Sequence, residues 1–277
     1  MNAVRFVNPN GETRIGRLED DGTITDAGPA GPQGFVPTTL AWQALGQADG
    51  PTHSAGEVKL LHPVVPGKIL AIGLNYRSHA EEIGAKPPNV PVVFAIWPSS
   101  LIGDRAHIVL PREETKPDYE GELAVVIGSP AYRADREEAA ASVGGISVFN
   151  DVSGRRAQME TPLKQYTLGK SFDTFSPMGP CIVSTEQTDL ANLDVRTTVS
   201  GEVMQEANTS DLIFPVEDLI VYLSAGVTLE PGDVIATGTP GGVGMSREPP
   251  RYLRDKDTVE INIEGIGTLT NPVRSEI

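Results

Sequence analysis

The chain has 277 residues, of which 39% are hydrophobic and 21% charged, and it carries a formal net charge of −15 at pH 7. These proportions are typical of a soluble globular protein and argue against extended disorder. The acidic balance argues against nucleic acid or an anionic membrane as a partner, because both bind through basic patches. A single cysteine, Cys181, excludes an intrachain disulfide, and the first residues contain no apolar signal core, so we expect a cytoplasmic protein.

Residues 1–62 predict a small β-rich domain. Short strands are expected at 4–7 and 15–18, separated by a turn rich in Asn, Pro and Gly. Pro and Gly residues at 62–67 are typical of a junction between domains. We therefore assign residues 63–277 to a second, larger domain.

The segment that follows the junction changes from strand-like to helical periodicity. A strand is expected at 68–73, and after it His79 and Glu82 lie three residues apart on one face of a polar helix. The carboxylate can hold the imidazole in one tautomer and raise its basicity, so the pair can act as a general base toward water. The alternative is an ordinary ion pair on the surface of a helix. A loop at 84–91 bounded by Gly and Pro follows and is of the kind that can hinge over a site.

Two carboxylates alternate along the predicted strand 118–128. Glu120 and Glu122 point the same way, while the apolar residues beyond them follow the opposite face. Asp151 closes another apolar run, 145–150, and brings a third oxygen ligand to the same point if the two strands are neighbours. Three carboxylates without a soft ligand nearby suit Mg²⁺ or Mn²⁺. The alternative is that the two glutamates form the solvated face of a half-buried strand.

The remaining patterns favour an α+β fold made mostly of β-structure. A helix with a capping box is expected at 134–143, an amphipathic helix at 215–226 and a β-hairpin at 259–270. Residues 157–169 are polar and lack a period, which indicates a surface excursion. The Gly-rich stretch 238–244 has no Lys after it, so its likeness to a phosphate-binding loop is weak.

Five motifs follow one another along the chain. They are Asn75-Tyr76-x-x-His79-x-x-Glu82, Glu120-x-Glu122, Asn150-Asp151-Val-Ser, Gly169-Lys-Ser-Phe-Asp-Thr-Phe-x-Pro-x-Gly-Pro180 and Thr237-Gly-Thr-Pro-x-Gly-Val-Gly244. From about Lys68 to the C-terminus the chain thereby resembles the fumarylacetoacetate hydrolase family. The resemblance implies a mixed β-roll or barrel core and a homodimer. The N-terminal domain resembles that family's small variable domain in size and position only.

The resemblance also implies roles for individual residues. It implies a Mg²⁺ or Mn²⁺ ion held by Glu120, Glu122 and Asp151. Catalytic roles are implied for His79, Glu82 and Lys170. Substrate contacts are implied for Tyr76, Arg155, Gln158 and Thr239.

The chemistry of these residues agrees with such an activity. A 2-oxo or 1,3-dicarbonyl acid can chelate a metal ion, which polarises the carbonyl and stabilises an enolate leaving group. His79, oriented by Glu82, would take a proton from the water that attacks the distal carbonyl, and Lys170 would supply positive charge. We therefore expect a hydrolase that cleaves a C–C bond of an acylpyruvate or 1,3-diketo acid.

Other reactions remain open because they need the same acidic centre. They are decarboxylation of oxaloacetate, isomerisation or decarboxylation of 2-hydroxyhepta-2,4-diene-1,7-dioate, ureidoglycolate lysis, and metabolite binding without catalysis. Two departures from the family pattern bear on the choice: Ile96 stands where many relatives carry Lys, and Arg156 stands where an acid is usual. Both lie in stretches expected to border or support the pocket, so they leave the substrate open.

Overall fold

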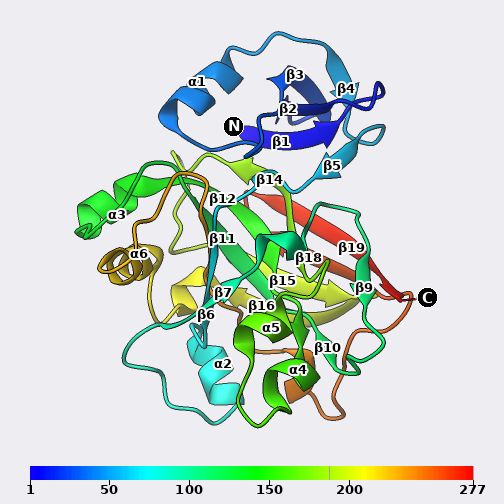
Figure 1. The fold of residues 1–277 in the computed structure, drawn as a ribbon, viewed down its shortest axis with the longest axis vertical. Helices are drawn as coiled ribbons and strands as arrows, with labels where there is room; N and C mark the ends of the chain where they lie inside the picture. The colour runs from blue at the N-terminus through cyan, green and yellow to red at the C-terminus, as the bar shows by residue number, and fades with distance from the viewer. Residues whose placement is uncertain (187, 277) are drawn as a thin grey trace.

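The computed structural model describes residues 1–186 and 188–276. Strands predominate, and the sheets of the described residues do not close into a barrel, in agreement with the predicted mostly β class and a mixed β-roll core. Figure 1 shows β1–β5 and α1 gathered at one end of the molecule, with α2, α4 and α5 at the opposite end.

The largest sheet has twelve strands. Its main path, in spatial order, is β4 (Thr52–Ser54), β3 (Thr23–Pro29), β2 (Thr13–Leu18), β1 (Asn2–Val7), β14 (Ser176–Val183), β12 (Val143–Asn150), β11 (Gly121–Ile127), β17 (Val234–Ala236), β6 (Ile69–Gly73) and β7 (Val92–Ile96). Two strands pair outside this path, β5 (Lys59–Leu61) with β1 and β8 (Leu101–Ile102) with β14.

Two smaller sheets complete the β-structure. The five-stranded sheet runs β16 (Glu202–Asn208), β15 (Asp194–Val199), β18 (Thr258–Ile263), β19 (Gly267–Ser275) and β9 (Ile108–Leu110). The two-stranded sheet pairs β10 (Pro117–Asp118) with β13 (Ser153–Gly154). The predicted C-terminal hairpin is confirmed by the antiparallel pairing of β18 with β19.

Six α-helices and three 3₁₀ turns lie between the strands of the described residues. The helices are α1 (Thr39–Gly46), α2 (Arg77–Glu82), α3 (Arg136–Ser142), α4 (Arg155–Met159), α5 (Tyr166–Lys170) and α6 (Val216–Ser224). The 3₁₀ turns are η1 (Pro98–Ser100), η2 (Thr209–Asp211) and η3 (Gly244–Ser246). None of the described helices combines the length and apolar character needed to span a bilayer.

The N-terminal strands extend the main sheet. The predicted strands at 4–7 and 15–18 are confirmed in β1 and β2, which pair antiparallel. β1 also pairs with β14, where Asn2 lies opposite Val183, so hydrogen bonds run from the N-terminal segment into the rest of the chain. The division at 62/63 stays a prediction.

Strand β11 lies at the centre of the sheet and is buried on both faces. Its apolar side chains alternate between two core clusters: Leu123, Val125 and Ile127 in one, Ala124 and Val126 in the other. Glu120 and Glu122 are only 5% and 1% exposed. The interpretation of these glutamates as a solvated strand face is therefore wrong, because other elements cover both sides of the strand.

Helix predictions succeeded where capping or periodicity was clear. The capping box of α3 is present, with Asp135 Oδ1 accepting from Glu138 N–H and Glu138 Oε2 accepting from Asp135 N–H. The predicted amphipathic helix is α6, whose buried side chains include the apolar stripe Val216, Leu219, Ile220 and Leu223.

The prediction of a surface excursion at 157–169 is confirmed for most of the segment, whose residues are largely exposed, but Gln158 and Gly169 are buried. The segment also contributes to the short helices α4 and α5. The two helices pack closely at Gly169, where a Cβ atom would lie 2.7 Å from Cβ of Gln158. Each helix has five residues, too few to display a helical period in the sequence. Tertiary contacts therefore specify this segment.

Substitution of Gly121, which lies between Glu120 and Glu122, tests the contact between the two larger sheets. A Cβ on Gly121 would lie 2.2 Å from Thr197 Oγ1 on β15, so Gly121→Ala must push the sheets apart. We expect a loss of about 1–3 kcal/mol in the free energy of unfolding, measured by urea denaturation. Gly226→Ala is the control, because a Cβ there meets nothing within 4 Å. Equal stability of the two variants would show that the sheets do not meet at this point.

Candidate active site

Strand pairing brings three carboxylates to one point. β11 and β12 run antiparallel with Gly121 opposite Asn150, and Asp151 N–H donates to the carbonyl of Glu120 at 2.9 Å. The ligand oxygens offered by Glu120, Glu122 and Asp151 all lie within 4.8 Å of one another. The predicted convergence of these three side chains is thus present.

Lys170 lies against this group from the end of α5. Its Nζ atom is 2.5 Å from Glu120 Oε2 and 2.6 Å from Asp151 Oδ2. Asp151 Oδ1 is buried and has no hydrogen-bond partner among the described residues. A buried carboxylate oxygen without a donor is costly, and a bound cation would satisfy it.

The three carboxylates differ in acidity because their neighbours differ. Burial raises the pKa of Glu122 well above its ordinary value, and repulsion from Asp151 and Glu120 adds to the rise. Burial also raises the pKa of Asp151, to about 7, although the charge of Lys170 opposes the shift. Burial acts in the same direction on Glu120, but the charges of Lys170 and Arg155 outweigh it and lower its pKa to about 2. Near neutral pH, protons therefore compete with a cation for Glu122 and Asp151.

The charges of the buried cluster do not balance. Its carboxylates are Asp118, Glu120, Glu122 and Asp151, and its cations are Arg155 and Lys170. When all six groups are ionised, four negative charges face two positive ones, and one divalent cation would neutralise the difference. The hard oxygen donors and the unpaired Asp151 oxygen fit such an ion, so the triad could bind a divalent metal. The choice of Mg²⁺ or Mn²⁺ stays a prediction.

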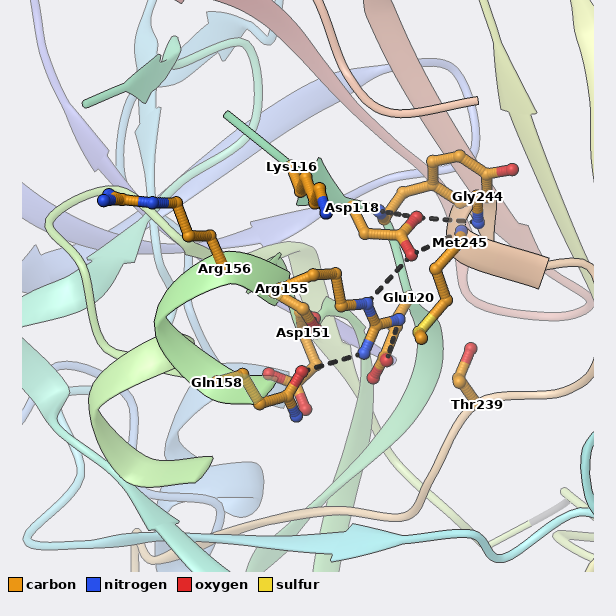
Figure 2. A network of polar contacts seen from close by, with 12 residues as sticks. Lys116, Asp118, Glu120, Asp151, Arg155, Arg156, Gln158, Thr239, Gly244 and Met245 are labelled. Carbon is orange, nitrogen blue, oxygen red and sulfur yellow. Dashed lines mark hydrogen bonds and ion pairs between the residues drawn. The ribbon is translucent and has the colours of Figure 1, made fainter. Parts of the chain in front are cut away.

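Arg155 lies within the buried charged cluster and bridges its carboxylates Asp118 and Glu120 (Figure 2). Its guanidinium donates from Nε to Asp118 Oδ2 at 2.9 Å, from Nη2 to Glu120 Oε1 at 2.7 Å and from Nη1 to Gln158 Oε1 at 3.0 Å. The side chain is buried and its donors point at protein oxygens. The geometry therefore favours a role in orienting Glu120 over the direct substrate contact that the resemblance implied.

Asp118 is the partner that the sequence did not single out. Its carboxylate accepts from Arg155 and from the backbone N–H groups of Gly244 at 2.7 Å and Met245 at 3.0 Å (Figure 2). Asp118 thereby ties the Gly-rich segment after β17 to the acidic strand. The strict alternation of Asp118 with Glu120 and Glu122 is the signal that could have identified it.

His79 and Glu82 form the predicted pair on α2. His79 Nδ1 lies 3.1 Å from Glu82 Oε2, and Glu82 Oε1 accepts from Gly242 N–H at 2.7 Å. Burial raises the pKa of Glu82, but the hydrogen bonds from His79 and Gly242 outweigh it, so the net pKa is lowered. An ionised Glu82 is the state that orients an imidazole through Nδ1 and leaves Nε2 to act as a base.

A cavity of about 380 Å³ opens above the acidic cluster. Seven of the ten predicted site residues line it: His79, Glu120, Glu122, Arg155, Gln158, Lys170 and Thr239. Two more contact lining residues, Glu82 through His79 and Asp151 through Lys170. The structure therefore brings nine of the ten predicted residues to one site.

The resemblance implied substrate contacts for Tyr76 and Thr239, but the Tyr76 side chain is buried and the Thr239 hydroxyl is hydrogen-bonded within the protein. Tyr76 is fully buried and is not among the residues that line the cavity. Thr239 lines the cavity, but its hydroxyl donates to the Gly121 carbonyl at 3.0 Å and accepts from Gln205 Nε2 at 2.7 Å. Gln205 also accepts from Gly121 N–H at 2.9 Å, a supporting contact that no sequence pattern indicated.

The two departures from the family pattern lie outside the cavity lining. Ile96 is 1% exposed and belongs to an apolar core cluster. Arg156 is exposed, points away from the acidic cluster (Figure 2) and donates to the carbonyl of Glu113. Neither side chain reaches the space above Glu120 and Glu122.

Comparison with known proteins identifies the family. A family model described as "Fumarylacetoacetate (FAA) hydrolase C-terminal" matches residues 68–274. The chain belongs to the fumarylacetoacetate hydrolase family, which confirms the resemblance drawn from the five motifs.

Individual relatives support an enzyme but carry different names. The human protein "Oxaloacetate tautomerase FAHD2A, mitochondrial" is 42% identical over 243 residues, covering 87% of this chain and 77% of that protein. A solved 5-carboxymethyl-2-hydroxymuconate delta-isomerase from Mycobacterium smegmatis is 36% identical with a TM-score of 0.83, and a fumarylacetoacetate hydrolase from psychrophilic Exiguobacterium antarcticum is 37% identical with a TM-score of 0.85. Both structural matches cover 100% of both chains.

Replacing Arg155 tests its place at the centre of the charged cluster. Arg155→Met leaves Asp118 buried without its cation and Glu120 with Lys170 as its one remaining cation, so we expect a loss of about 3–5 kcal/mol in the free energy of unfolding. Urea denaturation in the presence of EDTA measures it without interference from metal. Arg156→Met is the matched control, since its side chain is exposed, and should change stability by less than about 0.5 kcal/mol. Similar losses in the two variants would contradict the assignment.

Metal binding should strengthen as pH rises. The raised pKa values of Glu122 and Asp151 mean that the metal-free protein loses stability when these groups ionise, whereas a cation restores it. At a hundredfold excess of Mn²⁺ over its Kd the gain is about 2.7 kcal/mol, or several degrees in Tm. We expect this Tm increment to grow between pH 6 and pH 8, the range around the Asp151 pKa of about 7.

Differential scanning calorimetry with Mn²⁺ and with EDTA measures this increment at each pH. Asp151→Asn should abolish it, while Glu264→Gln, on an exposed turn, should keep it. An increment that stays constant with pH, or survives in Asp151→Asn, would mean that the metal binds elsewhere.

Proposed function

We propose that the protein is a divalent-metal-dependent enzyme that forms the enolate of a 2-oxo acid. The observation that carries the proposal is the convergence of Glu120, Glu122 and Asp151, of which the two glutamates line the cavity and Asp151 has an unpaired oxygen. When bound there, a divalent ion supplies electrophilic stabilisation of the negative charge that develops on a carbonyl oxygen. The relatives named as tautomerase, isomerase and hydrolase are consistent with one shared step of this kind.

The reaction that uses the His79–Glu82 pair and Lys170 together is hydrolysis of the C–C bond of an acylpyruvate or 1,3-diketo acid. His79, held by Glu82, takes a proton from water as its oxygen bonds to the distal carbonyl carbon. The bond between that carbon and the central methylene then breaks, and its electron pair forms the enolate of pyruvate. The imidazolium returns a proton to the enolate carbon, which completes pyruvate and releases a carboxylic acid.

Lys170 supplies positive charge at the acidic end of the cavity in this proposal. Its ammonium is buried, and interaction with Asp151 and Glu120 outweighs burial so that its pKa is raised. A permanently charged group beside the reacting oxygens can hold the carboxylate of a 2-oxo acid. Arg155 acts through Glu120, whose orientation it fixes.

Keto–enol tautomerisation of oxaloacetate is the second candidate. It is favoured by the human relative named as an oxaloacetate tautomerase, at 42% identity. The same enolate is formed, but His79 exchanges a proton with carbon and no water is consumed. We also propose that the protein is a cytoplasmic homodimer, as the sequence analysis predicted.

Replacing the imidazole separates catalysis from metal binding. His79→Ala should lower kcat by at least about a hundredfold, because general-base catalysis contributes that much. Mn²⁺ affinity, measured by isothermal titration calorimetry, should stay unchanged, because His79 is not among the three carboxylates. Glu82→Gln should lower kcat in the same direction, whereas the exposed neighbour Glu81→Gln should leave it unchanged.

A panel of acids with Mg²⁺, Mn²⁺ and an EDTA control distinguishes the reactions. Pyruvate formation from an acylpyruvate indicates hydrolysis, whereas a change in enol absorbance without new fragments indicates tautomerisation. Release of CO₂ or of urea would instead point to decarboxylation or ureidoglycolate lysis. Full activity in EDTA, or normal turnover by His79→Ala, would overturn the proposal.

A further inference from the structure

One wall of the cavity is apolar apart from the hydroxyl of Tyr166, and it begins beside the acidic cluster, where Met245 N–H donates to Asp118. It is formed by Ile83, Val92, Phe94, Met159, Tyr166 and Met245, which come from separate segments of the chain. The ring of Phe94 links this wall to the acidic end, because Lys170 Nζ lies 5.4 Å from its centroid. The ring of Tyr166 packs against Phe94 at 5.6 Å between centroids.

The apolar wall reaches the mouth of the cavity. Val92 and Phe94 lie two residues apart on β7 and share one face of that strand, and Val92 is 44% exposed. Ile83 and Met159, at the ends of α2 and α4, are 48% and 36% exposed. A molecule bound at the carboxylates would therefore extend along apolar side chains toward solvent.

The cations that line the cavity are already paired. Lys170 contacts Glu120 and Asp151, Arg155 contacts Asp118 and Glu120, and His79 contacts Glu82. The described lining residues include no other Lys, Arg or His. Lys170 and Arg155 lie at the acidic end, so a distal carboxylate held against the inner part of the wall would lose water without gaining a positive partner, in a chain whose net charge is −15.

From these observations we infer that the substrate is a 2-oxo acid with an uncharged, apolar distal substituent, such as an alkyl or aryl acyl group, and not a dicarboxylate. The inference rests on the proposed function, because it assumes that the 2-oxo acid end binds at the acidic cluster. The inferred substrate differs from oxaloacetate, the dicarboxylate in the name of the human relative. Recognition of the tail is assigned to the six wall residues.

Two unreactive probes with the same head measure this preference. N-butyloxamate and N-(3-carboxypropyl)oxamate share the 2-oxo acid end and have tails of similar size that end in a methyl group or a carboxylate. Isothermal titration calorimetry with the Mn²⁺-loaded protein gives a Kd for each probe. We expect N-butyloxamate to bind at least about tenfold more tightly. The corresponding diketo acids should show the same order of kcat/KM.

A matched pair of variants locates the preference in the cavity wall. Val92→Lys adds a cation to the wall, whereas Val93→Lys adds one to the adjacent residue, which is 38% exposed and does not line the cavity. We expect Val92→Lys to strengthen binding of the carboxylate probe by about three- to fivefold relative to Val93→Lys, as a half-exposed ion pair does. Both sites are partly exposed, and thermal melting confirms that each variant folds.

The outcomes separate this inference from the proposed function. Tighter binding of the butyl probe together with the selective effect of Val92→Lys supports the apolar tail. Equal or tighter binding of the carboxylate probe to the unmodified protein overturns the inference and leaves the proposed function intact. Equal effects of the two lysine variants also overturn it, because the wall would then not recognise the tail. If neither probe binds, the proposed function fails and the inference fails with it.

Discussion

Repulsion among buried carboxylates is the constraint on which the site depends. Isolated ionised groups in a protein interior are costly, so each of the four must have a partner. Arg155 pairs with Asp118 and Glu120, and Lys170 pairs with Glu120 and Asp151. The backbone N–H groups of Gly238 and Gly244 donate to Glu122 and Asp118, respectively. The pairing is incomplete at Asp151 Oδ1, which could accept a cation.

The negative and positive charges come from different kinds of structure. Glu122 lies on β11, and Glu120 and Asp151 flank the paired ends of β11 and β12. Core side chains pack on both faces of these two strands, so their backbones have little freedom to move. Arg155 and Lys170 instead lie on two short helices between β13 and β14. The sheet therefore fixes the spacing of the ligand oxygens, while the helices add neutralising charge from one side. This division explains why the chain tolerates so much charge beside its core.

Features of the site that depend on the local alternation of side chains could be predicted from the sequence. Features that depend on which strands are neighbours, and in which register, mostly could not. Period-two spacing was sufficient to place Glu120 and Glu122 on one face, and three-residue spacing was sufficient for His79 and Glu82. The contact with Asp151 required β12 to be the neighbour of β11, which no local pattern fixes. The family motifs, and not periodicity, supplied Lys170. The buried pairing of Arg155 with Asp118 remained hidden because neither residue reveals its partner in the linear sequence.

Specificity is harder to predict than chemistry for a physical reason. Acidic ligands interrupt an apolar strand and are therefore conspicuous, whereas a cavity wall is made of the same apolar residues as the core. Val92, Val93 and Phe94 follow one another on β7, and nothing in their order tells which face meets the cavity. The structure gives the answer: Val92 and Phe94 line the cavity together with Glu120 and Glu122, and Val93 does not. The groups that we propose to activate the substrate can thus be predicted from sequence, while the groups that we propose to select it emerge only from topology.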